Sequence, residues 1–564
     1  MFKLDKDALR KGLLHIGALL AMWCFYALLI EHFGGFTTVH LYRQWLEILV
    51  VLYLYGYLYI MLKPARGRAL LAAVPLLLIY LVHDVFFLAY GKVFRFVNLN
   101  ELPELLQILP ATHAVLLILL FVVPALLILR TIDYRRPLPI IAGLLPVAIT
   151  VFVIEATPAA FATGFQSVSS EIVKYSDVKS VENNGRLAMF LYREAQRLDM
   201  LDRIAPYRGR ARYEAHIAER VAQLRANLKP RNVHLIVLES FLDPRLFKDL
   251  KFSQSPVHPN FERLFGNTLG LSISPVFGGA TAQAEFEVLC GVPAFEKLSS
   301  VEFNAFTGAP AHCLPGILSS LDYRTVASNA YKPDFFNAQP AYRGIGFAEQ
   351  QFPTEFYGAQ ATYLRFGDPG VEEYLFDRDL FAQNLAFVRN HMEQHPGTPL
   401  FNYLMTIYGH TPHLLDPAER PETIKVISHY ADDHLQRATN QFYYRTQAVA
   451  AYVNELIALD KDSLTILISD HVPPLRNGAN TYNALRYMGN EEQSYYYNRI
   501  AIVEDGKPVK YPPLHHYDLP DVIANYLTEG RYCKAQQCDY MRRESKPREA
   551  SLDRYLALMA HASE

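Results

Sequence analysis

The chain has 564 residues, which is enough for more than one domain, and 51% of them are apolar. Its 54 basic and 56 acidic residues nearly balance, which argues against a nucleic-acid partner. Most of the apolar excess lies in roughly the first 160 residues, so the sequence predicts a membrane-embedded N-terminal part and a more polar remainder.

Five apolar segments stand out in the N-terminal part. Each has about 17 to 22 residues, enough at 1.5 Å per residue to cross a hydrocarbon core of roughly 30 Å. The first is too long for a removable signal peptide and lacks a small-residue cleavage site, so we expect a retained helix. The five predicted transmembrane helices are Leu13–Ile30, Leu46–Leu62, Ala69–Tyr90, Ala111–Leu129 and Leu138–Ile154.

The short loops between these segments differ in their content of Lys and Arg. Ten such residues fall on the side of the N-terminus and three on the other side. Because cytoplasmic loops carry the excess of positive charge, the pattern predicts a cytoplasmic N-terminus. With five spans, everything after the fifth helix then lies outside the cytoplasm.

Two polar features interrupt the membrane part. His83 and Asp84 lie within the third segment, where they either line a cavity that faces a lipid head group or reach to the interface. The outer loop that follows, residues 91–110, alternates apolar and polar residues in a way that favours a position along the membrane surface.

From Thr157 the chain turns polar, and two stretches, 189–201 and 212–228, have the periodicity of amphipathic helices. We expect them to connect the membrane part to an outer domain. The predicted division is therefore a transmembrane domain over 1–156, a helical connector over 157–230 and a catalytic domain over 231–564.

Apolar strands alternate with helices in the outer part. Continuous apolar runs of this kind are typical of strands buried on both faces, and their alternation with helices predicts an α/β domain with a central, mostly parallel sheet. The predicted strands are 232–238, 271–277, 323–330, 399–408 and 463–471, and the predicted helices include 259–264, 315–321 and one with Val449, Tyr452, Val453, Leu456 and Ile457 on its apolar side.

Chemically active side chains follow these strands. In sheets of this type, ligands bind outside the carboxyl ends of the strands, so the pattern gathers several groups at one edge. Two carboxylates, an imidazole and a hydroxyl form a ligand set that Zn²⁺ or Mn²⁺ accepts, with Mg²⁺ as a further candidate. The five residues are Glu239, Thr281, His410, Asp470 and His471.

Thr281 stands where Gly278-Gly279 frees the backbone to turn from a strand into a helix. Beside the positive end of a helix dipole, a hydroxyl is well placed to become a nucleophile, although an ordinary helix N-cap is the alternative. A metal ion would lower the hydroxyl pKa, and the nucleophile would carry a phosphoryl group covalently. His410 and His413 are candidates to bind phosphate or to protonate the leaving alcohol, and for His413 a surface loop position is the alternative.

These motifs resemble the alkaline phosphatase/sulfatase superfamily, and within it the membrane-bound lipoteichoic acid synthase-like phosphoglycerol transferases. NVHLIVLESF is similar to the family's first strand with its metal-binding Glu, GGATAQAEFEVLCG to the nucleophile segment, ISDH to the metal pair and YGHTPH to the substrate histidine stretch. The resemblance implies an extracytoplasmic domain on the bacterial inner membrane. It also implies one divalent metal ion held by Glu239, Thr281, Asp470 and His471, and substrate binding by His410, His413 and Asn337.

The resemblance further implies a reaction in which the phosphoglycerol head group of phosphatidylglycerol passes through Thr281 to a glycan hydroxyl. Ala338 departs from the synthases, which place an Arg after an aromatic-Asn pair, and this weakens an identical glycerophosphate pocket. A phosphoethanolamine transferase, and a catalytically inactive lipid-binding regulatory protein, are the alternatives. Sulfate-ester hydrolysis is disfavoured because the nearest match to the sulfatase nucleophile motif, Cys313 to Ile317, lacks its Arg.

Four of the five cysteines fall outside the cytoplasm in the predicted topology, where disulfides persist. Cys533 and Cys538 are close enough to close a local loop, and Cys290 with Cys313 would fix the helix that begins near Thr281.

Overall fold

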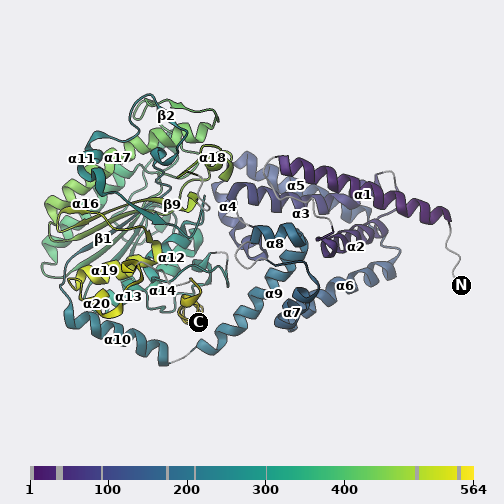
Figure 1. The fold of residues 1–564 in the computed structure, drawn as a ribbon, viewed down its shortest axis with the longest axis horizontal. Coiled ribbons are helices and arrows are strands. Elements are labelled where there is room, and N and C mark those ends of the chain that lie inside the picture. Colours follow the sequence, from purple (N-terminus) through teal and green to yellow (C-terminus); the bar gives the residue numbers. More distant parts are fainter. Residues whose placement is uncertain are drawn as a thin grey trace. The chain divides into compact units, whose positions relative to one another are not determined.

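The computed structural model describes residues 6–32, 42–65, 67–90, 93–172, 177–208, 211–299, 301–489, 494–542 and 548–564. The chain divides into two compact units, Met1–Asp202 and Arg203–Glu564 (Figure 1). The first unit is built from helices and the second is a mixed α/β unit, and each is described by itself.

The first unit consists of helices only, as far as its described residues go. They are α1 (Lys6–His32), α2 (Trp45–Met61), α3 (Arg68–Tyr90), η1 (Phe96–Glu101), α4 (Leu102–Ile108), α5 (Ala111–Thr131), α6 (Pro137–Ala156), α7 (Pro158–Val168), α8 (Asp177–Asn184) and α9 (Arg186–Ile204). Four of the five predicted apolar segments lie within helices of this unit, and the fifth, Leu46–Leu62, ends one residue after α2.

Three helical stretches are long and apolar enough to cross a membrane: Arg68–Leu88, Ala111–Thr131 and Pro137–Ala156. The apolar parts of the other two helices, Gly17–His32 and Trp45–Met61, are shorter. In α5, large apolar side chains are exposed along the whole helix, as a lipid-facing surface requires. The described residues therefore contain three candidate spans, and the five-span topology stays a prediction.

His83 and Asp84 are both buried inside the first unit. Asp84 pairs with Arg186, whose Nη2 lies 2.6 Å from Oδ1, and it also accepts a hydrogen bond from the Tyr26 hydroxyl. The His83 ring packs against the rings of Phe94 and Phe190. An arginine from a segment 102 residues later thus neutralises Asp84 inside the unit, and both the position facing a lipid head group and the position at the membrane interface stay predictions.

The second unit contains a nine-stranded sheet and a separate two-stranded sheet. The strands are β1 (Val233–Leu238), β2 (Lys251–Phe252), β3 (Gly270–Ile273), β4 (Arg324–Asn329), β5 (Glu349–Gln351), β6 (Leu400–Met405), β7 (Val426–Ile427), β8 (Leu464–Ser469), β9 (Tyr497–Glu504), β10 (Lys507–Val509) and β11 (Leu514–His515). Its α-helices are α10 (Ala211–Asn227), α11 (Pro259–Phe265), α12 (Thr281–Cys290), α13 (Leu314–Ser319), α14 (Ala338–Ile345), α15 (Thr354–Tyr357), α16 (Asp377–Gln394), α17 (Asp433–Leu459), α18 (Ala479–Ala484), α19 (Leu519–Leu527), α20 (Arg531–Gln536) and α21 (Leu552–Ala562).

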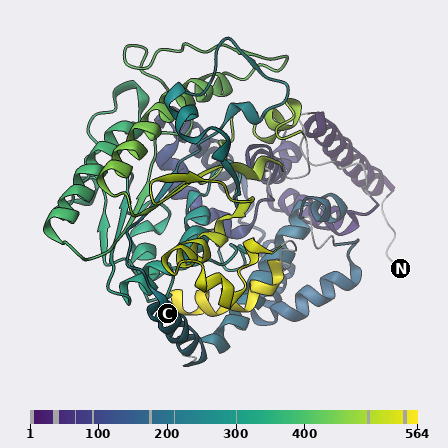
Figure 2. The same ribbon diagram turned by 60° about the vertical axis from the view of Figure 1, so that its left-hand side comes forward.

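The large sheet has the order β11-β3-β9-β8-β1-β6-β4-β5, with β10 added to β9. Pairing is parallel throughout from β8 to β5, and β9 is the strand that runs antiparallel to both of its neighbours on the main path. The predicted α/β class with a mostly parallel sheet is confirmed. Helices cover both faces of this sheet, with α11, α16 and α17 on one and α12, α13 and α19 on the other (Figures 1 and 2).

The centre of the sheet is formed by the most apolar segments. All residues of β1, β6 and β8 are buried, as their uninterrupted apolar runs predict. On one face they pack against α16 and α17. Four residues of α17 belong to the same core: Val449, Tyr452, Val453 and Leu456. This rigid centre carries the strand ends from which the candidate site is built.

The observed strands differ from the sequence-based expectation. The strand expected over 271–277 is only β3, Gly270–Ile273, because the chain leaves the sheet before its two glycines. Strand β9 was not expected, although its burial alternates at first as in a strand with one face covered. Both predicted disulfides, Cys290–Cys313 and Cys533–Cys538, are present, and Cys24 is free.

Candidate active site

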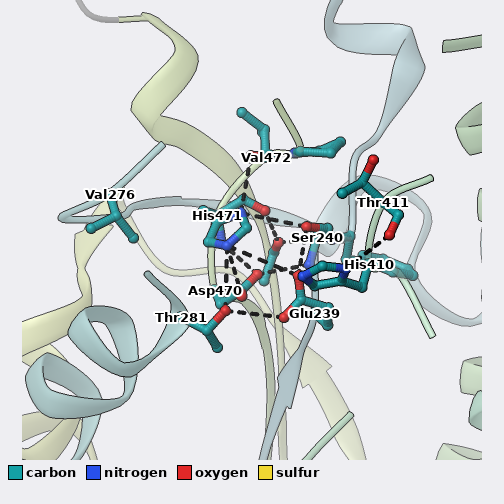
Figure 3. Close-up of polar contacts among 12 residues, drawn as sticks. Glu239, Ser240, Val276, Thr281, His410, Thr411, Asp470, His471 and Val472 are labelled. Atoms are coloured by element: carbon teal, nitrogen blue, oxygen red, sulfur yellow. Dashed lines mark hydrogen bonds and ion pairs between the residues drawn. The ribbon is translucent and has the colours of Figure 1, made fainter. Parts of the chain in front are cut away.

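Four predicted metal-binding residues come together at one edge of the sheet. Ligand atoms of Glu239, Asp470 and His471 all lie within 4.8 Å of one another, and all three side chains are buried. The Thr281 hydroxyl adjoins them (Figure 3). No other such group of three His, Cys, Asp or Glu occurs among the described residues.

The register of two neighbouring strands brings the two carboxylates together. β1 and β8 are parallel and in contact, and Leu238, the last residue of β1, pairs with Ser469, the last of β8. Glu239 and Asp470 therefore leave the sheet side by side at its carboxyl edge. The Asp470 N–H donates to the Leu238 carbonyl oxygen at 3.2 Å and extends the pairing by one bond.

A turn of unusual backbone geometry delivers Thr281. Gly278 and Ala280 have φ values of +71° and +59°, and α12 then begins with Thr281 itself. The N-cap position belongs to Ala280, and the helix has no side-chain cap, so the alternative in which Thr281 is an ordinary N-cap is wrong. Left-handed backbone at a non-glycine residue such as Ala280 is costly and is often found at functional sites.

The Thr281 hydroxyl points into the cluster. Its Oγ1 donates to Glu239 Oε2 at 3.0 Å and lies 3.4 Å from His471 Nε2. The His471 Nδ1 is 3.0 Å from the Val472 carbonyl oxygen. A carbonyl oxygen only accepts hydrogen bonds, so Nδ1 carries the proton and Nε2 carries the lone pair. The Nε2 lone pair is therefore turned toward the hydroxyl and the two carboxylates, as a metal ligand requires.

The electrostatics of the cluster favour a bound cation. Burial, and next the charge of Asp470, raise the pKa of Glu239 above its ordinary value, and burial raises the pKa of Asp470 to about 6. Asp470 Oδ2 is buried, lies 3.2 Å from His471 Nε2, and accepts no hydrogen bond from the residues that the structure describes. Two buried carboxylates with unsatisfied charge, an imidazole lone pair and a hydroxyl oxygen fit a divalent metal ion, which supplies the missing positive charge.

His410 lies beside the cluster without belonging to it. Its Nδ1 is 2.9 Å from the Thr411 carbonyl oxygen, its ring packs 5.2 Å from the ring of Tyr374, and its side chain lies on the Glu239 side of the site (Figure 3). The side chain is partly exposed, and a positive charge on it lowers the pKa of Glu239. This position is compatible with the predicted contact with substrate, which stays a prediction.

His413 is buried, whereas Asn337 is half-buried like His410. His413 is 1% exposed, its Nδ1 is 3.2 Å from Gln441 Oε1, and burial lowers its pKa to about 3, so it is neutral at physiological pH. Its Nε2 is buried and accepts no hydrogen bond from the described residues. The Asn337 amide donates to the carbonyl oxygens of Phe303 and Phe306. Substrate binding by these two residues stays a prediction, whereas the surface position considered for His413 is wrong.

Sequence reasoning missed Ser240. Its N–H donates to Asp470 Oδ1 at 2.7 Å, and its hydroxyl donates to Glu239 Oε1 at 2.8 Å, so one residue orients both carboxylates. It adopts a left-handed conformation with φ of +47°. The available signal was its position directly after the strand-end glutamate.

The fold and the site together define an α/β domain with a candidate metal centre next to an alcohol nucleophile. The chain belongs to the sulfatase family, whose model matches residues 231–527, just over half of the sequence. It is thus a member of the alkaline phosphatase superfamily, as the resemblance implied.

Known proteins similar to this chain include curated relatives and solved structures. A Rhizobium meliloti protein named for cyclic beta-1,2-glucan modification is 25% identical over 268 residues, covering 46% of this chain and 37% of that protein. An uncharacterised Haemophilus influenzae protein is 24% identical over 190 residues, covering 33% of each. The chain thus spans only about a third of the length of these relatives.

Among solved structures, the phosphoglycerol transferase GacH of Streptococcus pyogenes, in complex with sn-glycerol-1-phosphate, is 18% identical with a TM-score of 0.48; the match covers 62% of this chain and 92% of GacH. The lipoteichoic acid synthase LtaP of Listeria monocytogenes is 17% identical with a TM-score of 0.42, covering 55% of this chain and 78% of LtaP.

Membership of the sulfatase family does not bring the nucleophile that sulfatases use. The nearest motif begins at Cys313, and that sulfur is bonded to Cys290. A cysteine held in a disulfide is not a free thiol and does not act as a nucleophile. In this chain the hydroxyl beside the metal-ligand cluster belongs to Thr281.

Proposed function

We propose that this chain is a membrane-anchored, metal-dependent transferase that moves the phosphoglycerol head group of phosphatidylglycerol to a glycan hydroxyl. Residues 1–156 form the membrane domain, 157–230 the connector and 231–564 the catalytic domain in this proposal. The enzyme lies in the bacterial inner membrane with its catalytic domain in the periplasm. The observation that carries the proposal is the Thr281 hydroxyl 3.0 Å from Glu239 Oε2, within the buried cluster.

In the first half-reaction the Thr281 Oγ attacks the phosphorus of the lipid head group, and the bond from phosphorus to the diacylglycerol oxygen breaks. A metal ion held by Glu239, Thr281, Asp470 and His471, either Mn²⁺ or Zn²⁺, would lower the hydroxyl pKa and polarise the phosphoryl group. Thr281 releases its hydroxyl proton to solvent, and His410 donates the proton that the leaving diacylglycerol oxygen takes up.

In the second half-reaction a sugar hydroxyl of the acceptor attacks the phosphorus carried by Thr281. His410, now neutral, removes the proton of that hydroxyl, and the bond between phosphorus and the Thr281 oxygen breaks. The Thr281 oxygen takes up a proton from solvent, His410 keeps the proton of the sugar hydroxyl for the next cycle, and phosphoglycerol remains on the glycan. The transfer is thus divided into two displacements, first onto Thr281 and then onto the glycan. The same side chains act in both.

Three observations outside the site support the setting of this reaction. The candidate spans keep the enzyme at the membrane, where the scissile bond of a phospholipid lies. The two disulfides suit an oxidising compartment such as the periplasm. The relative named for cyclic beta-1,2-glucan modification supports a glycan as acceptor.

The test compares the purified full chain with its Thr281→Ala and Thr281→Ser variants in vesicles containing head-group-labelled phosphatidylglycerol. We expect diacylglycerol release to fall by about 10⁴-fold or more in Thr281→Ala, because loss of a nucleophile removes the reaction path. Thr281→Ser keeps the hydroxyl and should retain measurable release. Undiminished release by Thr281→Ala would overturn the proposal.

Mass spectrometry of the protein after a brief reaction identifies the head group. Vesicles that contain phosphatidylglycerol and phosphatidylethanolamine together offer both donors. We expect a phosphoglycerol adduct on Thr281. A phosphoethanolamine adduct would transfer the proposal to that head group, and a metal-loaded chain that releases neither would indicate a regulatory protein without catalysis.

A further inference from the structure

The backbone of Glu239 is held at both ends by side chains. Its N–H donates to the Thr406 Oγ1 at 3.0 Å, and its carbonyl oxygen accepts a hydrogen bond from Arg445 Nη1 at 2.7 Å. Glu239 follows the last residue of β1, so side chains here replace the bonds that a neighbouring strand would provide. Thr406 follows β6, whereas Arg445 comes from the middle of α17.

Arg445 is itself fixed in place. The side chain is 2% exposed, its Nε donates to Asp377 Oδ2 at 2.7 Å, and its guanidinium carbon lies 5.1 Å from the centre of the Phe241 ring. Asp377, in the first turn of α16, is completely buried. A buried arginine whose planar head is directed by a carboxylate and an aromatic face has little freedom to move.

The loop that carries His410 is packed against the same bond. A Cβ at Gly409 would lie 1.9 Å from the Glu239 carbonyl oxygen and 2.2 Å from Arg445 Nη1, so this position has no room for a side chain. The hydrogen bond between Arg445 and Glu239 is therefore enclosed by backbone on the side of His410. Thr406 and Arg445 bond to the Glu239 backbone, and Asp377 holds Arg445 in place. These three side chains are called the Glu239 clamp below.

We propose that the Glu239 clamp positions Glu239 for the metal ion, with Arg445 as its principal positioning residue. This inference rests on the proposed metal centre and assigns a role to residues that touch neither metal nor substrate. The clamp fixes the Glu239 backbone, and Ser240 and Thr281 bond to the carboxylate that projects from it. Groups behind the ligands commonly contribute about 10- to 100-fold to metal affinity.

A purely structural role would make a different prediction. A buried arginine-aspartate pair that only stabilised the fold would lower the unfolding temperature when broken, and the folded protein would still bind metal with unchanged affinity. Positioning requires that the folded variant binds metal more weakly. Metal affinity measured well below the unfolding temperature separates these two roles.

His234 offers a matched control. It lies in the same strand as the residues leading to Glu239 but at the opposite end, is completely buried, and bonds through Nε2 to Asp460 Oδ2 at 2.9 Å. His234→Leu leaves Asp460 without this partner and should lower stability. It should not change the metal affinity, since it does not disturb the carboxyl edge of the sheet.

The experiment titrates the full chain, purified in detergent and stripped of metal, with Mn²⁺ and with Zn²⁺ in a calorimeter. We expect Arg445→Met to weaken metal binding about 10- to 100-fold. Arg445→Lys should recover only part of the loss. The guanidinium bonds to Glu239 and Asp377 at the same time, whereas the single ammonium group of lysine can bond to one of them.

Thr406→Val tests the other end of the clamp with almost no change in volume, and it decides the question if Arg445→Met does not fold. We expect weaker metal binding, by a smaller factor than for Arg445→Met. Unchanged affinity in the folded variants, or an equal loss in His234→Leu, would overturn the inference. Failure of the unmutated chain to bind either metal would instead overturn the proposed metal centre, so the two failures are distinguishable.

Discussion

Each unit of this protein buries a pair of carboxylates, Glu47 and Asp84 in the first and Glu239 and Asp470 in the second. In the first unit, both Asp84 oxygens accept hydrogen bonds, from the Arg186 guanidinium and from the Tyr26 hydroxyl. Glu47 accepts from three successive backbone N–H groups at the start of α9, and from Tyr80. This cluster finds all its partners within the chain.

The second pair also accepts hydrogen bonds, from Ser240 and Thr281, but Asp470 Oδ2 accepts none from the described residues. The charge of Asp470 raises the pKa of Glu239, and among the described residues no Lys or Arg side chain is bonded to either carboxylate. Arg445 lies nearby, but its guanidinium donates to the Glu239 carbonyl oxygen and to Asp377. The comparison teaches that a buried carboxylate pair indicates a ligand site when the chain leaves its charge uncompensated. When the chain compensates the charge, the pair indicates a structural contact.

The contact between Glu47 and the start of α9 in the first unit combines two effects. The first N–H groups of a helix have no partners within the helix and carry partial positive charge, so the Glu47 carboxylate satisfies donors and meets a favourable dipole. Gly185, just before α9, has φ of +94°, and a Cβ there would lie 2.4 Å from the Glu47 side chain. The start of α9 is thereby fixed to α2.

The largest effect is expected at the uncompensated pair. Asp470→Asn should remove tight binding of Mn²⁺ or Zn²⁺ and lower head-group transfer by about 10⁴-fold, as for other losses of a central catalytic group. In the metal-free chain the same change should maintain or raise the unfolding temperature, because it removes one of two like charges. Calorimetric metal titration and thermal unfolding in the presence of chelator measure the two effects.

Asp243→Asn is the control for the expected effect of Asp470→Asn on the unfolding temperature, because it should change that temperature in the opposite direction. Asp243 is also completely buried in the second unit, but it pairs with Arg245 at 2.9 Å and with Arg499 at 2.8 Å. Its neutralisation should lower the unfolding temperature of the metal-free chain. If Asp470→Asn destabilised the metal-free chain as much as Asp243→Asn, the distinction between the two kinds of carboxylate would be lost.

In the first unit, Arg186→Met should be destabilising by about 3–5 kcal/mol, since it leaves Asp84 as an uncompensated buried charge. Thermal unfolding of the full chain in detergent micelles detects the change. The double variant Asp84→Leu with Arg186→Met removes both charges and should recover much of the loss. A single variant as stable as the unmutated chain would show that Asp84 has another source of compensation.

The sequence was informative where structure is local. The apolar runs that became β1 and β8 also place Glu239, Asp470 and His471 at strand ends, and parallel pairing then brings them together. Arg445 gave no such signal. It lies in a helix where charged residues usually face water, and its partner Glu239 is 206 residues earlier in the chain.

The same reason explains why the sequence did not predict the partner of Asp84. Its neutralising partner, Arg186, lies 102 residues later, in a region that reads as a polar connector. Hydropathy predicts that a segment is apolar enough for a membrane, but it carries no information on which distant residue will satisfy an internal charge. Long-range ion pairs follow from the packed structure and not from the periodicity of either segment.

Glu285 adds a third way of neutralising a buried carboxylate and gives the smallest expected effect. It lies in α12 one turn after Thr281, and its Oε2 accepts hydrogen bonds from the hydroxyls of Tyr342 and Tyr403 at 2.5 and 2.7 Å. Burial raises its pKa from 4.5 to about 7, so a proton neutralises it where Arg186 neutralises Asp84.

Because the pKa of Glu285 is higher in the folded than in the unfolded chain, its contribution is fully present below pH 4.5 and is lost as the pH rises through about 7. The shift corresponds to about 3 kcal/mol. Glu285→Gln keeps an acceptor for both tyrosines without the charge, so its unfolding temperature should fall less than that of the unmutated chain between pH 5 and 8. Glu262→Gln, at a side chain that is 54% exposed, should follow the unmutated profile. Parallel profiles for Glu285→Gln and the unmutated chain would mean that Glu285 does not hold its proton in the folded state.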